Sequence, residues 1–125
     1  MNLPCCLTGE VVHGKALGRT VGMPTANLKI LDKELPEPGV YATRIRIRGE
    51  VFLSVTNIGT RPSVDSAEDI TVETYIMDFR KDIYGEHVIL EVIEFLRPVQ
   101  KFESLKDVQR QVEKDVLRAQ ECFEK

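Results

Sequence analysis

The chain has 125 residues, of which 42% are hydrophobic and 30% charged, and its formal net charge is -3. This length supports one hydrophobic core, so we expect a single domain over residues 1–125. The acidic balance argues against a nucleic-acid partner or an anionic membrane surface, because both are bound by clustered Lys and Arg. The sequence shows no signal peptide and no apolar run long enough to span a bilayer, which predicts a cytoplasmic location.

Cysteine and histidine residues are few and dispersed. Cys5, Cys6 and Cys122 form no CxxC pair, and His13 and His87 lie far apart. Zinc sites and disulfide frameworks need closely spaced ligands or paired cysteines, so neither is predicted. Free thiols of this kind suit a reducing compartment.

Residues 9–28, GEVVHGKALGRTVGMPTANL, form a glycine-rich and basic loop that leads into a strand. The spacing of its first glycines and Lys15 resembles a phosphate-binding Walker A loop, but Ala16 stands where that loop needs a hydroxyl for magnesium. Pro24 and the later glycines also exclude the helix that should follow. We therefore predict an open loop that binds phosphate through backbone amides and two cations. Its candidate nucleotide-binding residues are Gly14, Lys15, Gly18, Arg19 and Gly22.

Two oxygen-bearing side chains close this loop. Thr25 and Asn27 are one residue apart in an extended segment, so their side chains point to the same side. A hydroxyl and a carboxamide oxygen are ligands suited to Mg²⁺, and both residues are candidate metal and nucleotide ligands. The alternative is that they only shape a turn through their own hydrogen bonds.

The segment 41–48 alternates with a period of two, which predicts a strand with one buried face and one wet face that carries arginines. Gly49 turns the chain, and Val51, Leu53 and Val55 continue the alternation in a partner strand. Segments 70–79 and 88–95 show the same pattern and are separated by a turn at residues 82–85. The sequence therefore predicts a strand-rich region over about residues 8–95.

The period changes near residue 104. Apolar residues then fall at steps of three and four, as on one face of an amphipathic helix: Leu105, Val108, Val112, Val116, Ala119 and Phe123. Ser104 and Asp107 make a capping-box-like start, which predicts a helix over about residues 104–124. Six short antiparallel strands and one helix favour a closed barrel, because closure removes exposed strand edges.

Ordered sequence blocks run through nearly the whole chain. After the GEVVHG loop and the Pro24-Thr25-Ala26-Asn27 turn come Pro38-Gly39-Val40-Tyr41-Ala42, Asn57-Ile58-Gly59-Thr60-Arg61-Pro62, Glu73-Thr74-Tyr75-Ile76, Asp82-Ile83-Tyr84-Gly85 and Arg97-Pro98-Val99-Gln100-Lys101-Phe102. In content and order they resemble the riboflavin kinase (flavokinase) family, like the C-terminal kinase domain of bacterial bifunctional riboflavin kinase/FAD synthetases. Ser63 and Tyr75 depart from the family pattern. The resemblance implies a mainly β fold, a six-stranded antiparallel Greek-key barrel with one C-terminal helix.

The resemblance also implies an activity and its substrates. The enzyme would transfer the γ-phosphoryl group of MgATP to the ribityl 5′-hydroxyl of riboflavin, giving FMN and ADP. Mg²⁺ would be the cofactor, held by Thr25 and Asn27, with ATP as co-substrate. Glu73 would be the catalytic base and contact the flavin. A fused or separate FAD synthetase domain is an expected partner, whereas this chain by itself is expected to make no FAD.

The remaining residues that the resemblance assigns lie in the later blocks. Arg97 and Phe102 would border the flavin ring, and Tyr84 would border the nucleotide. Plainer interpretations stay open: Glu73 as a solvent-facing strand residue, Phe102 as a core side chain, and Tyr84 as a structural turn residue. Asn57 and the arginine of the same block are expected to brace the barrel through hydrogen bonds to its backbone.

Two rival functions remain at this stage. One is a catalytically inactive flavin- and nucleotide-binding regulatory module on the same fold, against which Thr25, Asn27 and Glu73 argue. The other is a small nucleic-acid-binding barrel, which would need a basic face with exposed stacking aromatics. Eight aromatic residues and a negative net charge do not supply such a face.

Overall fold

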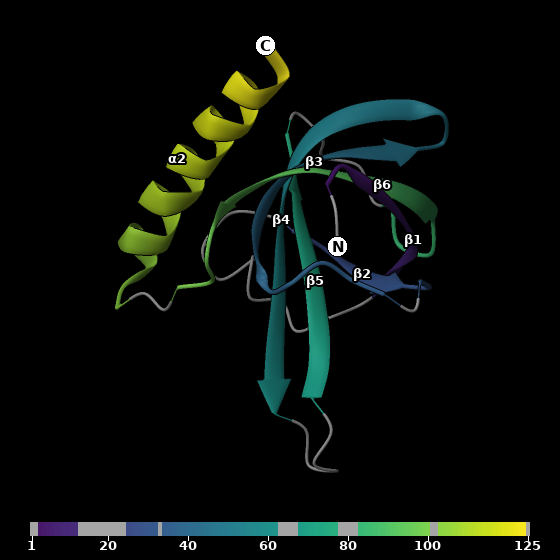
Figure 1. Ribbon diagram of the computed structural model, residues 1–125, viewed down its shortest axis with the longest axis horizontal. Helices are drawn as coiled ribbons and strands as arrows, with labels where there is room; N and C mark the ends of the chain where they lie inside the picture. Colours follow the sequence, from purple (N-terminus) through teal and green to yellow (C-terminus); the bar gives the residue numbers. More distant parts are fainter. Residues whose placement is uncertain are drawn as a thin grey trace.

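The computed structural model describes residues 3–12, 25–32, 34–62, 68–77, 83–100 and 103–124. These residues form six strands and one helix (Figure 1): β1 (Cys5–Val12), β2 (Ala26–Ile30), β3 (Gly39–Ile47), β4 (Glu50–Pro62), β5 (Glu68–Ile76), β6 (His87–Arg97) and α2 (Leu105–Glu124). The predicted strands and C-terminal helix are confirmed. In this described part of the chain, no helix has both the length and the apolar character needed to cross a bilayer.

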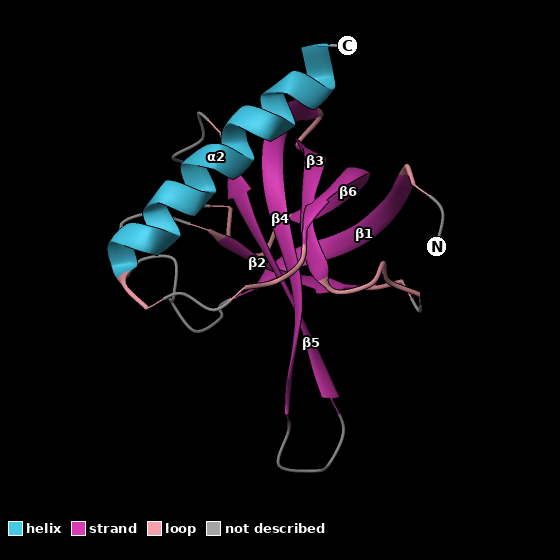
Figure 2. Ribbon diagram, turned by 60° about the vertical axis from the view of Figure 1, so that its left-hand side comes forward, coloured by secondary structure: helices cyan, strands magenta, loops and turns pink. Residues whose placement is uncertain are grey.

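The strands close into a barrel in the order β1-β2-β5-β4-β3-β6, and every neighbouring pair is antiparallel. Because β6 pairs with both β3 and β1, the sheet has no free edge along its closed part. The ends of β4 and β5 project beyond the rest of the barrel as a two-stranded arm, and α2 lies along one side (Figure 2). The predicted closed antiparallel barrel with one helix is confirmed.

The β3–β4 connection is a two-residue turn. Ile47 pairs with Glu50, and Arg48 and Gly49 between them have φ values of 52° and 84°. Two successive positive φ values give a turn whose twist matches that of paired strands. The turn predicted at Gly49 is therefore confirmed, and it requires a left-handed conformation from Arg48 as well.

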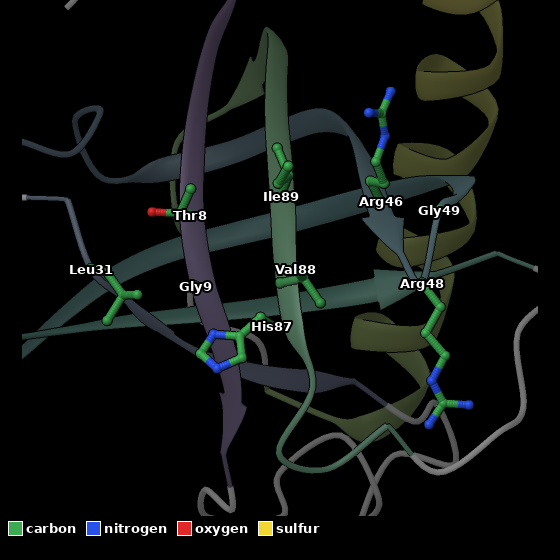
Figure 3. A pocket seen from close by; sticks show the side chains of 9 residues that line it. All are labelled: Thr8, Gly9, Leu31, Arg46, Arg48, Gly49, His87, Val88 and Ile89. Carbon is green, nitrogen blue, oxygen red and sulfur yellow. The ribbon is translucent and has the colours of Figure 1, made fainter.

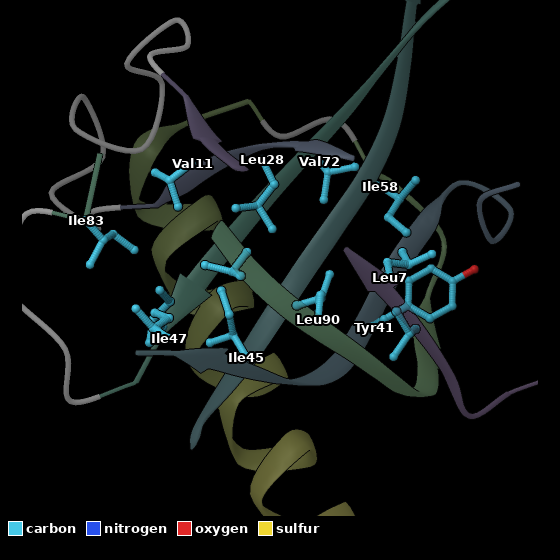
Figure 4. Close-up of a cluster of buried hydrophobic side chains, with 13 residues drawn as sticks. Leu7, Val11, Leu28, Tyr41, Ile45, Ile47, Ile58, Val72, Ile83 and Leu90 are labelled. Atoms are coloured by element: carbon cyan, nitrogen blue, oxygen red, sulfur yellow. The ribbon is translucent and has the colours of Figure 1, made fainter. Parts of the chain in front are cut away.

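The inner face of the barrel carries one apolar cluster (Figure 4). It consists of Leu7, Val11, Leu28, Tyr41, Ile45, Ile47, Ile58, Val72, Ile76, Ile83, Val88, Leu90 and Val92. Alternation in β3 supplies Tyr41, Ile45 and Ile47 to this cluster, as the period of two predicts. The arginines between and after them are exposed.

Four hydroxyl side chains extend this inner face and are fully buried. Thr43 is hydrogen-bonded to Ser54 at 2.6 Å and to Thr56 at 2.9 Å, and Thr56 is bonded to Thr74 at 2.9 Å. The chain of bonds crosses from β3 to β4 to β5. Burial of these groups is tolerated because each hydroxyl has a partner.

The outer face of β3 and β4 is covered by α2. Val40, Ala42, Val55, Met77, Leu96 and Ala119 form a second buried cluster there. Val55 therefore lies under the helix on the outer face, whereas Val51, further along β4, is 50% exposed. The helix begins as predicted, since the backbone N–H of Asp107 donates to Ser104 Oγ at 3.2 Å.

Candidate functional site

Three polar residues lie side by side across the barrel wall. Glu73 on β5 is the direct register partner of Asn27 on β2 and also of Asn57 on β4. Side chains directly opposite each other on antiparallel strands have Cβ atoms about 4.5–5.5 Å apart. The structure therefore places the Glu73 carboxylate between two carboxamides. We call this set, Asn27, Glu73 and Asn57, the polar row.

The polar row faces outward. Each of its members has a neighbour in the chain that belongs to the inner cluster. Leu28 follows Asn27, Val72 precedes Glu73 and Ile58 follows Asn57, and these three neighbours are only 6%, 4% and 1% exposed. Successive strand residues point to opposite faces, so the row lies on the outside of the wall. Asn27 and Glu73 are half-buried and Asn57 is exposed. A ligand can thus reach all three from solvent.

Thr25 lies directly before β2, is half-buried, and is two positions from Asn27. Its hydroxyl, the Asn27 carboxamide and the Glu73 carboxylate offer hard oxygen donors of the type that Mg²⁺ binds. Over the described ranges, no group of three or more His, Cys, Asp or Glu side chains could hold a metal ion. Binding of Mg²⁺ by Thr25 and Asn27 stays a prediction.

Arg97 lies further along the same register line, because Val40 pairs with both Asn57 and Arg97. Its guanidinium is held by the helix: Nε donates to Oδ1 of Asp115 at 2.9 Å and Nη2 donates to Oδ2 at 2.8 Å. Nη1 donates to the carbonyl of Pro98 at 3.2 Å. The plane of the predicted flavin-binding guanidinium is thus fixed where β6 leads toward α2.

Asp115 is the buried partner in this ion pair and is only 1% exposed. It also accepts a hydrogen bond from Nε2 of Gln111 at 3.1 Å. Nearby, Arg118 Nη1 donates to the carbonyl of Leu96. These bonds tie α2 to the end of β6, beside the polar row. Asp115 could not be predicted from the sequence, because a single acidic residue on a helix gives no signal of its distant partner.

Tyr84 lies in the turn before β6 and is 55% exposed. The next residue, Gly85, donates its backbone N–H to the carbonyl of Val11 at 2.9 Å. Val12, the last residue of β1, pairs with Asn27 of the polar row. The turn that holds Tyr84 therefore lies beside the end of β1 that is next to the polar row. The structure brings Tyr84 to this end of the barrel without placing it in the row itself.

Six predicted site residues lie outside the described residues: Gly14, Lys15, Gly18, Arg19, Gly22 and Phe102. Their assigned roles stay predictions. Among the described site residues, the structure brings together Asn27 and Glu73, and Thr25 lies two residues before Asn27 in the chain. It adds Asn57, which the sequence analysis assigned to bracing the barrel. That bracing role stays a prediction.

A separate hollow of about 350 Å³ lies on the opposite wall, formed by β1, β6 and the β3–β4 turn (Figure 3). Its lining comprises Thr8, Gly9, Leu31, Arg46, Arg48, Gly49, His87, Val88 and Ile89. At its rim Arg48 Nε donates to Oε1 of Glu86 at 2.8 Å, and this hydrogen bond holds the pKa of Glu86 below its usual range. The hollow contains none of the predicted site residues.

The sequence matches the riboflavin kinase family (Flavokinase) over residues 1–123. A bifunctional riboflavin kinase/FMN adenylyltransferase of Haemophilus influenzae is 40% identical over 121 residues, which cover 96% of this chain and 39% of the relative. An RNA-binding riboflavin kinase of Bacillus subtilis is 36% identical over 118 residues, covering 94% of this chain and 51% of the relative. The chain thus spans between about two fifths and one half of the length of these relatives.

Solved structures show the same fold. A crystal structure from Streptococcus pneumoniae described as a macrolide-efflux protein has a TM-score of 0.89 at 36% identity, covering 94% of this chain and 38% of that one. Riboflavin kinase from Trypanosoma brucei has a TM-score of 0.67 at 26% identity, covering 96% of this chain and 77% of that one. With a family match across nearly all of its length, the chain belongs to the riboflavin kinase family.

Proposed function

We propose that this chain is an ATP-dependent riboflavin kinase that converts riboflavin and ATP into FMN and ADP. The observation that carries the proposal is the polar row, which sets the one carboxylate of the row between two neutral amides on an accessible wall. Family membership supplies the substrate class. Riboflavin, FMN, ATP and ADP are therefore the proposed ligands, and the cytoplasm the proposed compartment.

Glu73 is the proposed catalytic base. Its carboxylate accepts a hydrogen bond from the ribityl 5′-hydroxyl and takes up that proton as the oxygen forms a bond to the γ-phosphorus. The bond between the γ-phosphorus and the bridging oxygen breaks at the same time, and ADP leaves with that oxygen. Phosphoryl transfer places little demand on base strength, so Glu73 contributes mainly by orienting the hydroxyl.

Thr25 and Asn27 are the proposed oxygen ligands of Mg²⁺. A bound Mg²⁺ ion would neutralise phosphate charge on the nucleotide. The two side chains belong to the segment that enters β2, and the strand pairing fixes Asn27 next to Glu73. This arrangement supports a binding mode in which the terminal phosphates of the nucleotide lie close to the Glu73 carboxylate, which also orients the acceptor hydroxyl.

A nucleic-acid partner is not part of the proposal, although one relative is named as RNA-binding. The chain has a negative net charge, and its exposed Arg44 and Arg48 are paired with Glu91 and Glu86. An FMN adenylyltransferase domain, as in the name of the bifunctional relative, is a proposed fused or separate partner. An inactive flavin-binding module is the remaining alternative.

The test is to incubate the purified chain with riboflavin, ATP and Mg²⁺ and to separate the flavins by chromatography. FMN formation supports the kinase, whereas bound but unchanged riboflavin supports the inactive module. Glu73→Gln should keep flavin binding and lower kcat about a hundredfold or more. Glu50→Gln, an exposed position at the start of β4, is the matched control and should keep kcat. Equal kcat values for the two variants would exclude Glu73 as the base.

A further inference from the structure

We propose that Gly59 creates the place where the ribityl chain of riboflavin lies against the barrel wall, an inference that rests on the proposed function. Gly59 follows Asn57 by two residues on β4, so both positions belong to the outer face of the wall. Gly59 pairs with Thr71 on β5, which lies two residues before Glu73. The glycine is therefore diagonal to the carboxylate that is proposed to orient the acceptor hydroxyl.

Gly59 leaves an opening in the layer of outer side chains. A Cβ atom added to it would lie 3.2 Å from Oγ1 of Thr71 and 3.8 Å from Oδ1 of Asn57. Apart from the chain neighbours of Gly59, no other atom of the described residues lies within 4 Å of that point. We call this space, bordered by Gly59, Thr71 and Asn57, the Gly59 gap. Asn57 is exposed and the other two residues are half-buried, so solvent and ligands reach the gap.

The chemistry of the Gly59 gap favours a neutral chain of hydroxyl groups. An alcohol is both donor and acceptor, so a ligand hydroxyl can donate to the Asn57 carboxamide oxygen and share a hydrogen bond with the Thr71 hydroxyl. A phosphate group would bring negative charge to the same face as the Glu73 carboxylate, which repels it. The gap therefore suits the polyol of the acceptor better than the phosphates of the nucleotide.

Strand order places the Gly59 gap on the acceptor side of Glu73. From Glu73 the register line crosses β4 and β3 and reaches Arg97, the residue predicted to border the flavin ring. On the β2 side, Glu73 pairs with Asn27, a proposed Mg²⁺ ligand. Because attacking and leaving oxygens lie in line on opposite sides of the phosphorus, nucleotide and riboflavin approach from different sides. The gap lies on β4, the first strand on the way to Arg97.

The distance from the gap to Glu73 suits the length of the chain. Diagonal neighbours on paired antiparallel strands lie about 7–8 Å apart. An extended ribityl chain with its terminal oxygen covers about this distance, so a chain that lies in the gap brings its 5′-hydroxyl to the Glu73 carboxylate.

The backbone itself does not require glycine at this position. Among the described glycines, positive φ values occur at Gly49 and Gly85 and not at Gly59. Alanine is therefore compatible with the strand, and the Thr71 side chain can rotate away from an added methyl group. Replacing glycine by alanine at such a position also reduces the entropy of the unfolded chain. The melting temperature of Gly59→Ala should thus stay near that of the unmodified chain, and a loss of binding would come from the filled gap.

The experiment measures equilibrium binding to the full chain, with riboflavin followed by its fluorescence in the presence and absence of MgADP. Gly59→Ala should weaken riboflavin binding about tenfold or more, since one extra carbon in a binding site has an effect of this size. Thr71→Val keeps the shape and removes the hydroxyl, so it should weaken riboflavin binding about threefold to tenfold. In both variants the affinity for MgADP should stay unchanged. The affinity for lumiflavin, which has the ring but no ribityl chain, should also stay unchanged.

Val51→Ile is the matched control, because it adds one carbon to an exposed side chain on the same outer face of β4, eight residues from Gly59. This variant should bind riboflavin as the unmodified chain does. If Gly59→Ala does not fold, Thr71→Val decides in its place.

Four outcomes would contradict the inference. Unchanged riboflavin affinity in Gly59→Ala would overturn it, and an equal loss for lumiflavin would place the flavin ring in the gap instead of the chain. An equal loss for MgADP would place the nucleotide there. Absence of riboflavin binding by the unmodified chain would overturn both this inference and the proposed function. If the unmodified chain binds riboflavin but makes no FMN, the kinase assignment fails, whereas weaker binding in Gly59→Ala would still support the place of the ribityl chain.

Discussion

Replacement of Asp115 by alanine should destabilise the protein by about 3 kcal/mol. The substitution removes both charge-assisted hydrogen bonds to Arg97, whose side chain is only 16% exposed. Breaking a buried ion pair from one side costs about 3–5 kcal/mol, and the partial exposure of Arg97 places this case at the lower end. An unfolding entropy of about 2.1 cal/mol/K per residue gives about 0.26 kcal/mol/K for 125 residues. The melting temperature should therefore fall by about 11 °C.

Thermal melting followed by circular dichroism measures this shift. Glu91→Ala is the matched control, because it breaks an exposed pair with Arg44 whose side chains are 46% and 37% exposed and 3.4 Å apart. That pair should contribute less than about 1 kcal/mol. Replacing both charges, as Arg97→Met with Asp115→Leu, should recover much of the lost stability, because no unpaired charge remains buried. If Asp115→Ala melts no lower than Glu91→Ala, the ion pair does not anchor the helix.

Three further outcomes are expected. Thr25→Ala and Asn27→Ala should weaken Mg²⁺-dependent ATP binding, measured by calorimetry, and leave the affinity for riboflavin in the absence of nucleotide unchanged. An equal loss of the affinities for ATP and riboflavin would point to misfolding. Gly39→Ala should lower the free energy of unfolding by about 1–3 kcal/mol, since an added Cβ would meet the Phe95 ring at 2.5 Å. In a double-mutant cycle measured by denaturant unfolding, adding Phe95→Ala should reduce the loss caused by Gly39→Ala. Burial raises the pKa of Cys5 above the ordinary 9.0, so alkylation of this thiol should be slower in the folded than in the unfolded chain. Because the thiolate is disfavoured in the folded chain, the free energy of unfolding should fall as the pH rises above the pKa of the unfolded thiol.

Sequence patterns predicted the strands and the helix because their periods differ. Alternation in β3 and the steps of three and four in α2 each follow from one buried face. The two faces of β4 were harder to assign. Its apolar Val55 faces the helix, whereas its hydroxyls Ser54 and Thr56 lie inside the barrel and are each hydrogen-bonded to Thr43 on β3. Neither the covering helix nor these bonds can be inferred from the strand alone.

In the candidate site too, the sequence indicates which residues matter but not which of them are neighbours. The sequence blocks pointed to Asn27 and Glu73, but only strand register makes them neighbours and adds Asn57 between Glu73 and β3. Register between strands far apart in the chain is set by closure of the whole barrel. For the same reason the bond between Arg97 and Asp115 had no signature in either segment.

The position of β6 in the barrel has a consequence for synthesis of the protein. Both of its neighbours, β1 and β3, precede it in the chain, and it alone joins them. On the ribosome, the first five strands can form at most an open sheet in which β1 and β3 present bare edges until the last strand emerges. Such edges invite pairing with other nascent chains. Stalled or truncated synthesis that ends before His87 should therefore yield aggregating fragments, and chaperone demand should peak just before this strand leaves the exit tunnel.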